Sequence, residues 1–434
     1  MRTARVATFG CKVNQHETTL MEDALLEAGY MLVSERDPAD LIVVNSCTVT
    51  HRADSDARKA VRQALRRNPE TFVVMTGCFA QVAPSLAAKQ DGIDLVLGNG
   101  EKLDLSRYLP LDLSKRETAD LQVGAIGEVS TLSLPAAPRS GDRSRAFLKV
   151  QEGCHLRCAF CIVPVARGNE RSVPLEEVLT AVEGYRAQGY PEVVLTGVHL
   201  GGYGRDHGYT LADLVRAIDQ QGLVRQRISS LEPMEVNDDF LDAVTASTSV
   251  CRHFHLPLQA GSDAVLRRMG RPYTVAQYDQ ICTRLRAWAP ETCIGADIIV
   301  GFPGETLEDF QATAEYLADG PIDYAHLFPY SPREGTRAAK MVDQIDAREK
   351  GRRMAVLQAI DQRNRQRFAQ SNDARVFDCV LEWPTHDSRP ETINGVADNY
   401  AQCRVATATI EGKPSVARLA MRWEGERLLG RTLP

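Results

Sequence analysis

Residues 152–164 read EGCHLRCAFCIVP and place Cys154, Cys158 and Cys161 in a C-x3-C-x2-C array. A zinc site usually takes four ligands from two C-x2-4-C pairs or from a Cys/His mixture, and no fourth cysteine or histidine stands at such a spacing. An iron-sulfur cluster fits better, because three thiolates hold three irons of a cubane and leave the fourth iron open to a small molecule. The array therefore predicts a metal cluster that binds a ligand.

Outward from the array, the chain alternates apolar runs with helix-length segments. Six predicted strands lie at residues 146–150, 192–196, 226–230, 253–258, 296–300 and 325–330. Strands that alternate with helices are typical of an α/β fold with parallel strands, and six such units predict an open (βα)6 partial barrel. In parallel α/β folds the site forms at the carboxyl ends of the strands, which here lead into polar or glycine-rich turns.

The N-terminal part has its own parallel pattern. Apolar runs at residues 5–9, 40–45, 71–77 and 94–98 alternate with amphipathic segments such as 17–29, which predicts a parallel sheet covered by helices. Cys11, Cys47 and Cys78 each follow one of these strands by one or two residues. Strand ends of a parallel sheet meet at one edge, so the three thiols can converge and hold a second cluster. The alternative is three buried, inert cysteines.

Length and composition bound the domain organisation. At about 150 residues per domain, 434 residues predict close to three folding units. We expect an α/β domain at 1–113, a linker at 114–139, a barrel at 140–370 and a small β-barrel at 371–434. The linker is placed at 114–139 because this stretch is rich in Ser, Pro and Gly.

No apolar run approaches the 18 or so residues of a membrane span, and the N-terminus has no signal-peptide core. The sequence predicts a cytoplasmic protein without membrane contact.

Longer motifs run through the whole barrel region. They read RAFLKVQEGC (145–154), PVARGNERSVP (164–174), LTGVHLGGYG (195–204), SSLEP (229–233), HLPLQAGSDAVLRRM (255–269), ADIIVGFPGET (296–306) and YSPREGT (330–336). With the N-terminal cysteines and the C-terminal barrel, these motifs resemble the radical S-adenosylmethionine (SAM) methylthiotransferase family. The flanks GCKVNQ (10–15), SCTVT (46–50) and GCFAQ (77–81) are most similar to the bacterial branch that acts on N6-threonylcarbamoyladenosine in tRNA.

The resemblance implies an enzyme that transfers a methylthio group to C2 of this nucleoside next to the tRNA anticodon. It implies two [4Fe-4S] clusters, on Cys154, Cys158 and Cys161 and on Cys11, Cys47 and Cys78, with SAM bound at the first. No side chain is expected to act as an acid or base, because the radical chemistry takes place at the clusters. The implied partners are the tRNA anticodon stem-loop, an electron donor such as flavodoxin or ferredoxin, and a sulfur source.

The strand-end turns of the barrel would place SAM. We expect Phe160 against the adenine, Thr196 and Gly197 near the amino acid moiety, Glu232 near the ribose, and Gln259 and Asp297 lining the pocket. For Glu232 and Asp297 the alternative is a structural carboxylate that caps a turn or pairs with an arginine. His155, inside the array, is expected to be an exposed spacer.

RNA contact needs a local basic surface, because the net charge is -6. Residues 347–367 predict a helix whose inner face carries Met354, Leu357 and Ile360 and whose outer face carries Arg353, Arg363, Arg365 and Arg367. A solvated amphipathic helix without RNA is the alternative. The tail resembles a TRAM domain, in which Trp383, Tyr400 or Trp423 would either stack on bases or belong to the core.

Three other functions stay open. Two share the chemistry and change the substrate to isopentenyladenosine in tRNA or an aspartate of a ribosomal protein. The third is a non-catalytic iron-sulfur protein that binds RNA. The five remaining cysteines have no spacing that suggests a site and are expected in the core: Cys251, Cys282, Cys293, Cys379 and Cys403.

Overall fold

The computed structural model describes residues 1–48, 51–134, 144–222, 225–384 and 389–433, without the side chains of residues 51–54. The chain forms two compact units, which are described separately. The first contains Met1–Ser140, Gln151–Arg157 and Cys161–Val173, and the second contains Gly141–Val150, Cys158–Phe160 and Pro174–Pro434. The end of the SCTVT motif, at 49–50, and the predicted boundary at 139–140 lie outside the described residues. The predicted four-part division of the chain stays a prediction.

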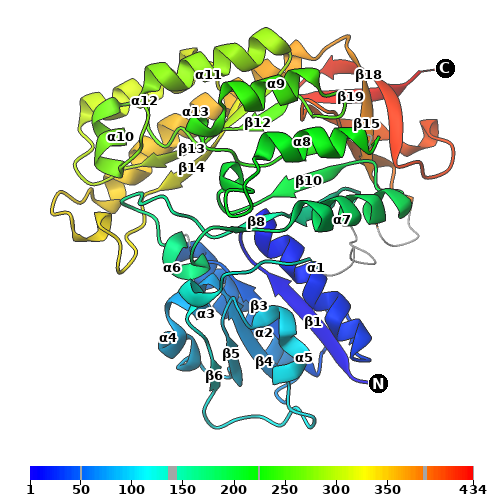
Figure 1. Cartoon of the computed structure of the whole chain (residues 1–434), viewed down its shortest axis with the longest axis vertical. Helices are drawn as coiled ribbons and strands as arrows, with labels where there is room; N and C mark the ends of the chain where they lie inside the picture. Colours follow the sequence, from blue (N-terminus) through cyan, green and yellow to red (C-terminus); the bar gives the residue numbers. More distant parts are fainter. Residues whose placement is uncertain (49–50, 135–143, 223–224, 385–388, 434) are drawn as a thin grey trace. The chain divides into compact units, whose positions relative to one another are not determined.

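The first unit is built on a six-stranded sheet whose order is β2-β1-β3-β4-β5-β6 and whose neighbours are all parallel (Figure 1). This confirms the predicted N-terminal parallel α/β fold. The strands are β1 (Thr3–Thr8), β2 (Met31–Leu32), β3 (Leu41–Ser46), β4 (Phe72–Gly77), β5 (Leu95–Leu97) and β6 (Asp120–Gln122). The helices of this part are α1 (Lys12–Glu27), α2 (His51–Arg67), α3 (Cys78–Val82), α4 (Pro84–Ala88), α5 (Leu105–Tyr108) and the short 3-10 turns η1 (Lys102–Asp104) and η2 (Ile126–Glu128).

Alternate residues of the central strands enter two separate apolar layers. Leu41 and Val43 of β3 pack with Met21 and Leu25 of α1. Ile42 and Val44, the residues between them, pack in a second layer that includes residues of α2. Because successive side chains of a strand point to opposite faces, a continuous apolar run indicates a strand covered on both sides. This is why the sequence of β3 shows no polar alternation.

The segment predicted as a linker, 114–139, contributes a strand. β6 pairs with β5 in parallel and extends the sheet at its edge. All three residues of β6 are exposed. An exposed edge strand of three residues carries neither the apolar run nor the alternation on which sequence reasoning depends, so the linker prediction was wrong for residues 120–122.

The second unit contains the six predicted barrel strands. They form two parallel sheets, β11-β10-β7 and β12-β13-β14, and the parallel bridges Gln226↔Val250 and Ser230↔His255 connect the two. The result is the predicted open (βα)6 barrel. The strands are β7 (Ala146–Lys149), β10 (Val193–Thr196), β11 (Gln226–Ile228), β12 (His253–His255), β13 (Cys293–Val300) and β14 (Tyr324–Pro329).

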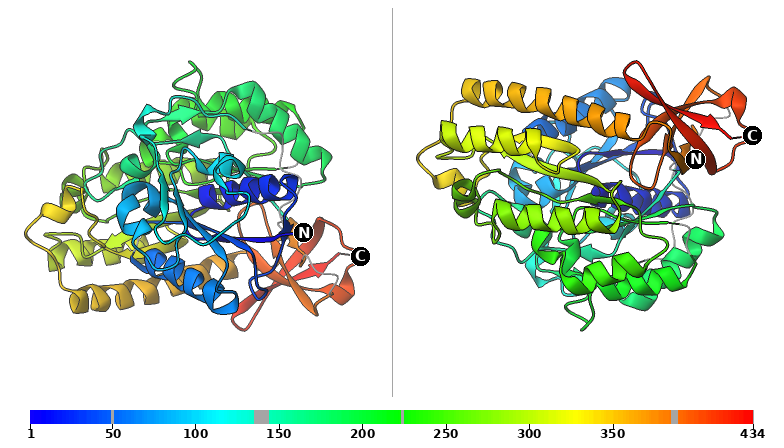
Figure 2. Two further views of the ribbon diagram at one scale, coloured as in Figure 1. Left: turned by 90° about the horizontal axis from the view of Figure 1, so that it is seen from below. Right: turned by 90° about the horizontal axis from the view of Figure 1, so that it is seen from above.

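Helices lie along one side of these strands in Figure 1 and Figure 2. They are α7 (Leu175–Ala187), α8 (Leu211–Gln220), α9 (Asp238–Ala246), α10 (Asp263–Met269), α11 (Val275–Trp288) and α12 (Leu307–Asp319), with the 3-10 turns η3 (Leu200–Gly202), η4 (Pro233–Glu235) and η5 (Ala338–Lys340). The rings of Phe240 on α9 and Trp288 on α11 contact Phe254 of β12 edge to face. Phe254 therefore faces the helices, and its neighbours His253 and His255 face the barrel interior.

The cysteine array lies between two short strands. The paired strands β8 (Gln151–Glu152) and β9 (Arg171–Ser172) flank the array and the helix α6 (Val163–Arg167) that follows it. Cys154 and Cys161 belong to the first compact unit and Cys158 belongs to the second.

A long helix, α13 (Ala347–Ser371), leads into the C-terminal barrel, as Figure 2 shows in orange and red. The barrel is closed in the order β15-β16-β17-β19-β18, which confirms the predicted small β-barrel. Its elements are β15 (Val376–Glu382), β16 (Thr392–Val396), β17 (Gln402–Ala406), η6 (Thr407–Thr409), β18 (Val416–Glu424) and β19 (Arg427–Thr432).

The outward face predicted for α13 needs one correction. Arg363, Arg365 and Arg367 are exposed and Leu357 is buried, as expected. Arg353 is buried instead, and its guanidinium contacts Glu305 at 2.5 Å and Glu349 at 2.9 Å. The helical period placed Arg353 outside because a buried arginine and an exposed one look alike until the acidic partner is known.

No helix in the described part of the chain has the length and apolarity to cross a membrane.

Candidate functional site

The loops after β1, β3 and β4 are tied together by buried polar side chains. The side-chain amide of Asn14, on α1, donates to the carbonyl of Phe9 at 2.7 Å and to that of Ser46 at 3.1 Å. The hydroxyl of Ser46 donates in turn to the carbonyl of Thr76. Phe9, Ser46 and Thr76 each stand one or two residues before a predicted cluster cysteine. These bonds hold the three strand ends in one place.

The cysteines on these loops approach one another. A methyl group on Gly10 would lie 2.7 Å from Cβ and 2.9 Å from Sγ of Cys47, so the Cys11 loop runs directly against Cys47. Gly10 also has a φ of 104°, which strongly favours glycine. Solvent reaches Cys11, yet the protein around it raises the pKa of its thiol by desolvation; Arg167 acts against this shift and the neighbouring Cys78 adds to it.

Arg167 is the cationic centre of this cysteine group. Its Nε donates to Sγ of Cys78 at 3.3 Å, and Nη1 donates to Glu17 at 2.6 Å and to Glu152 at 3.3 Å. The ammonium of Lys102 also contacts Glu17 and donates to Asn99. All four charged side chains are buried.

This network keeps positive charge against the Cys78 sulfur. Burial acts to lower the pKa of Arg167, but the negative charges of Cys78, Glu152 and Glu17 raise that pKa well above its usual value. Two carboxylates balance the guanidinium and ammonium, which is the condition for stable burial of such charges.

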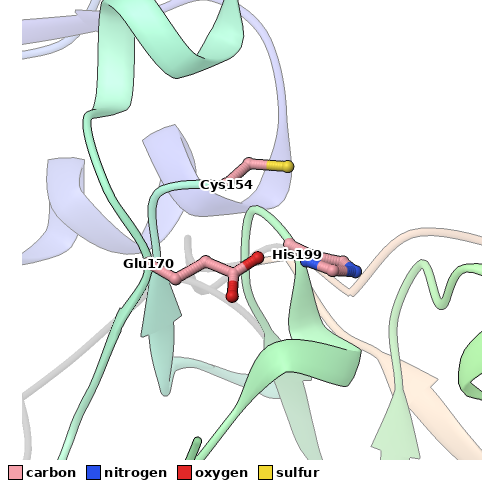
Figure 3. A group of neighbouring side chains, drawn as sticks. All are labelled: Cys154, Glu170 and His199. Atoms are coloured by element: carbon pink, nitrogen blue, oxygen red, sulfur yellow. The ribbon is translucent and has the colours of Figure 1, made fainter. Parts of the chain in front are cut away.

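The array itself is held by close backbone packing. The amide of Cys154 donates to the carbonyl of Gly168 at 3.1 Å. A methyl group on Gly153 would lie 1.8 Å from the carbonyl oxygen of Asn169, so only glycine fits before Cys154. Figure 3 shows Cys154, on the loop after β8, and Glu170, directly before β9. Glu170 accepts from the backbone amide of His155 at 3.1 Å and lies 3.2 Å from Nδ1 of its largely exposed ring, so Glu170 holds His155 in place.

Cys158 has a different arginine, Arg271. Nη1 of Arg271 donates to Sγ of Cys158 at 3.2 Å, and Nη2 pairs with Glu232. Nε donates to the hydroxyl of Tyr273 at 3.1 Å. Burial raises the pKa of the Cys158 thiol, Arg271 acts to lower it, and Glu232 acts to raise it.

The residues predicted to place SAM all lie in the second unit. Phe160 packs against a buried cluster that includes Tyr273 and Phe302. The hydroxyl of Thr196 is buried without a hydrogen-bond partner, and Gly197 follows it at the end of β10. An unpaired buried hydroxyl fits a site that a polar ligand completes.

The other predicted pocket residues have partners within the protein. Glu232 is paired with Arg271, which is the structural alternative considered for it. Asp297 contacts His255 at 2.9 Å and His326 at 3.4 Å. Gln259 has a backbone φ of 68°, which is unusual for a residue with a side chain. Its backbone N–H donates to the backbone carbonyl of Asp297 at 2.8 Å. Such backbone strain is concentrated at functional sites.

Sequence reasoning missed Arg167, Glu17, Lys102 and Arg271. No period or spacing distinguishes them from surface charges, because their partners lie as far as 150 residues away in the chain. Arg167 does stand in the PVARG motif six residues after Cys161. A charged residue so close to a cysteine array was the only available signal.

Comparison with known proteins identifies the family. Residues 3–98 match the family described as uncharacterized protein family UPF0004, and residues 148–317 match the radical SAM superfamily. Threonylcarbamoyladenosine tRNA methylthiotransferase MtaB of Aquifex aeolicus is 41% identical over 85% of this chain and 90% of its own length. The chain belongs to the radical SAM methylthiotransferase family. It is an enzyme of this type, and its superfamily implies SAM and a [4Fe-4S] cluster.

Further relatives include two substrate classes. The Bacillus subtilis protein with the same name as the Aquifex relative is 36% identical over 92% of this chain and 89% of its own length. A tRNA-2-methylthio-N(6)-dimethylallyladenosine synthase of Symbiobacterium thermophilum is 34% identical over 87% of this chain and 83% of its own.

Among solved structures, the radical SAM methyltransferase TsrM of Kitasatospora setae, with tryptophan substrate and a SAM analog bound, has a TM-score of 0.55. The sequences are 16% identical, and the match covers 78% of this chain and 75% of that one. The likeness supports the fold.

Proposed function

We propose that this enzyme transfers a methylthio group to C2 of N6-threonylcarbamoyladenosine beside the anticodon of tRNA. The observation that carries the proposal is the 41% identity to a threonylcarbamoyladenosine tRNA methylthiotransferase across 85% of the chain. The dimethylallyladenosine relative stands at 34%. The motifs GCKVNQ and GCFAQ around Cys11 and Cys78 point to the same substrate.

We also propose the six cysteines as ligands of two [4Fe-4S] clusters. All eleven cysteines of the chain are free thiols, so none is held in a disulfide. Cys11, Cys47 and Cys78 stand on three loops joined by Asn14 and Ser46, and Cys154, Cys158 and Cys161 stand on one loop. In each group one sulfur accepts a hydrogen bond from a buried arginine. Three thiolates with a nearby cation match the donors of an open cubane.

When bound, the cluster on the array supplies the electron that cleaves SAM, and the N-terminal cluster supplies the sulfur. The residues of the chain hold the reactants in place. Arg271 would fix the Cys158 sulfur, and Arg167 would fix that of Cys78. The hydroxyl of Thr196 would bond a polar group of SAM, and Phe160 would lie against its adenine.

A hollow beside the C-terminal barrel is the proposed surface for tRNA. It has a volume of about 560 Å³, and Arg365 and Gln366 of α13 line one side. Arg404, Trp423 and Arg427 line the barrel side. Arginines bond phosphates, and the face of a tryptophan ring stacks on a base. Tyr400 is excluded from this role, because it stacks on His253 with ring centroids 4.2 Å apart.

The other two predicted aromatic residues, Trp383 and Trp423, are both half-buried and both pack against the barrel core. Nε1 of Trp383 donates to the carbonyl of Pro414 at 2.8 Å, whereas Trp423 lines the hollow. Trp423 is therefore the aromatic residue that we assign to RNA.

Mass spectrometry of tRNA nucleosides tests the substrate. A strain that lacks this gene should lose 2-methylthio-N6-threonylcarbamoyladenosine and retain its unthiolated precursor. The same gene carrying Cys154→Ala should fail to restore the product. Loss of the methylthio group from dimethylallyladenosine alone would refute the proposal.

A further inference from the structure

The interior face of β12, β13 and β14 carries a connected group of polar side chains. Asp297 and His326 are register partners on β13 and β14, so their side chains point to the same face. His255 of β12 pairs with Gly295, two residues before Asp297, and therefore shares this face. In parallel α/β folds the site forms at the carboxyl ends of the strands, and the interior face that carries this group leads to those ends.

Asp297 fixes both histidines. Its Oδ1 lies 2.9 Å from Nε2 of His255 and 3.4 Å from Nδ1 of His326. The two rings stack with centroids 4.9 Å apart at 30°. Burial acts to raise the pKa of Asp297, but His255 and His326 outweigh it and lower the pKa below its usual value. The carboxylate is therefore charged; it lies within hydrogen-bond distance of the His255 ring and within ion-pair distance of the His326 ring.

The two histidines differ in whether a ring nitrogen is exposed to a ligand. His255 is buried, and its Nδ1 lies 3.2 Å from the hydroxyl of Tyr324. The side chain of His326 is 53% exposed. With Nδ1 of His326 turned to Asp297, its Nε2 points away from the carboxylate. That nitrogen accepts a hydrogen bond when the ring is neutral and donates one when the ring is protonated.

The opposite end of this face is closed. The ring of Tyr400 stacks on His253, the first residue of β12, and the guanidinium of Arg227 lies 5.3 Å from the centre of the Tyr400 ring. The hydroxyl of Tyr324 lies 2.8 Å from Nε2 of His253. A ligand therefore meets this face at His326, on the side away from Tyr400.

We propose that His326, oriented by Asp297, is the residue that recognises the polar N6 substituent of the substrate adenosine. This inference rests on the proposed function. A threonylcarbamoyl group carries N–H, hydroxyl and carboxylate groups that bond an imidazole, whereas a dimethylallyl group carries none. A dimethylallyl group placed there would leave Nε2 without a partner, and a site built around a hydrogen bond rejects an analogue that lacks it.

Two anticodon stem-loop RNAs, one with N6-threonylcarbamoyladenosine and one with N6-dimethylallyladenosine at the same position, test the proposal. The reconstituted enzyme is assayed with each RNA, and equilibrium binding of each RNA is measured by fluorescence anisotropy. The variants are His326→Phe and His326→Gln. His207→Gln, which changes a histidine on the loop after η3, is the matched control.

We expect His326→Phe to lower kcat/KM for the threonylcarbamoyl RNA by about tenfold to a hundredfold. Its affinity for this RNA should fall relative to its affinity for the dimethylallyl RNA, whereas iron content and 5′-deoxyadenosine formation without RNA should not change. His326→Gln, which keeps a hydrogen-bonding side chain, should retain part of the preference. The control should match the wild type.

Three results would overturn the inference. One is an equal loss on both RNAs, and another is an unchanged preference in His326→Phe. The third is one equivalent of bound zinc or iron that is lost with His326, because the ligand atoms of His255, Asp297 and His326 lie within 4.8 Å of one another and would then form a metal site. A wild-type enzyme that modifies only the dimethylallyl RNA refutes the proposed function itself, and the inference with it.

Discussion

The two proposed cysteine sites reach similar chemistry through different construction. Cys154, Cys158 and Cys161 lie within eight residues of one loop, whereas Cys11, Cys47 and Cys78 come from three strand ends that are 36 and 31 residues apart. Both sites place an arginine N–H on one sulfur, at 3.2 Å for Arg271 and Cys158 and at 3.3 Å for Arg167 and Cys78. The two arginines differ in the number of carboxylates that they pair with: Arg271 pairs with one and Arg167 with two. The N-terminal site therefore depends more on long-range packing.

The largest expected difference between the sites is in SAM cleavage. The triple variant Cys154→Ala, Cys158→Ala, Cys161→Ala should lose 5′-deoxyadenosine formation by at least about a thousandfold, because the proposed electron route to SAM is gone. The triple variant Cys11→Ala, Cys47→Ala, Cys78→Ala should still cleave SAM but form no methylthiolated tRNA. Mass spectrometry of both products after reduction measures this. Equal SAM cleavage by the two variants would remove the distinction between the sites.

The next effect concerns stability of the N-terminal site. Arg167→Met leaves the buried carboxylates of Glu17 and Glu152 without the guanidinium that they share, which should cost about 3–5 kcal/mol in the free energy of unfolding of this unit. Hydrogen exchange of peptides from β3 and β4 in the metal-free protein, with urea denaturation, measures the loss. The exposed pair Arg186 and Glu183 supplies the control, since Arg186→Met should change stability by less than about 0.5 kcal/mol. A change as small in Arg167→Met would show that the network is not needed for folding.

A smaller effect is expected on the other arginine. Arg271→Met removes a hydrogen bond to the Cys158 sulfur and should lower the rate of 5′-deoxyadenosine formation by about 10- to 100-fold, the usual cost of losing an outer partner of a metal ligand. Iron bound at the N-terminal site should not change. Arg271→Lys, which keeps a cation near Glu232, should lose less. If the methionine variant cleaves SAM at the wild-type rate, the arginines of the two sites do not have parallel roles.

The smallest effect is expected outside both sites. Cys251, Cys282, Cys293, Cys379 and Cys403 are buried in the second unit. Single substitution of any of them by alanine should leave iron content unchanged, because neither proposed site uses these sulfurs. Iron analysis of the five reconstituted variants checks this. A loss of iron in any one of them would show that the ligand set is incomplete.

The two sites also differ in how far sequence alone revealed them. The array was evident from spacing, and the six barrel strands from their apolar runs, since both signals are local. The N-terminal group required the further step that successive strands of a parallel sheet end at one edge. The bonds from Asn14 to the carbonyls of Phe9 and Ser46 show the physical means by which those ends are joined.

Buried charges and edge strands were beyond sequence reasoning. Lys102 and Arg353 are of residue types that usually lie on the surface. Only their ion-pair partners, Glu17 and Glu305, explain why they are buried. β6 is too short and too exposed to leave a pattern. His326 was overlooked because its role depends on its register partner Asp297, and register is a property of the folded sheet.

Iron and sulfide analysis of the two triple-alanine variants tests the central claim most directly. After anaerobic reconstitution the wild-type enzyme should bind about eight irons and eight sulfides per chain, because each proposed cluster contains four of each. Each triple variant should retain about four. Full iron content in the variant lacking Cys11, Cys47 and Cys78, or only four irons in the wild type, would contradict the account of two separate thiolate sites.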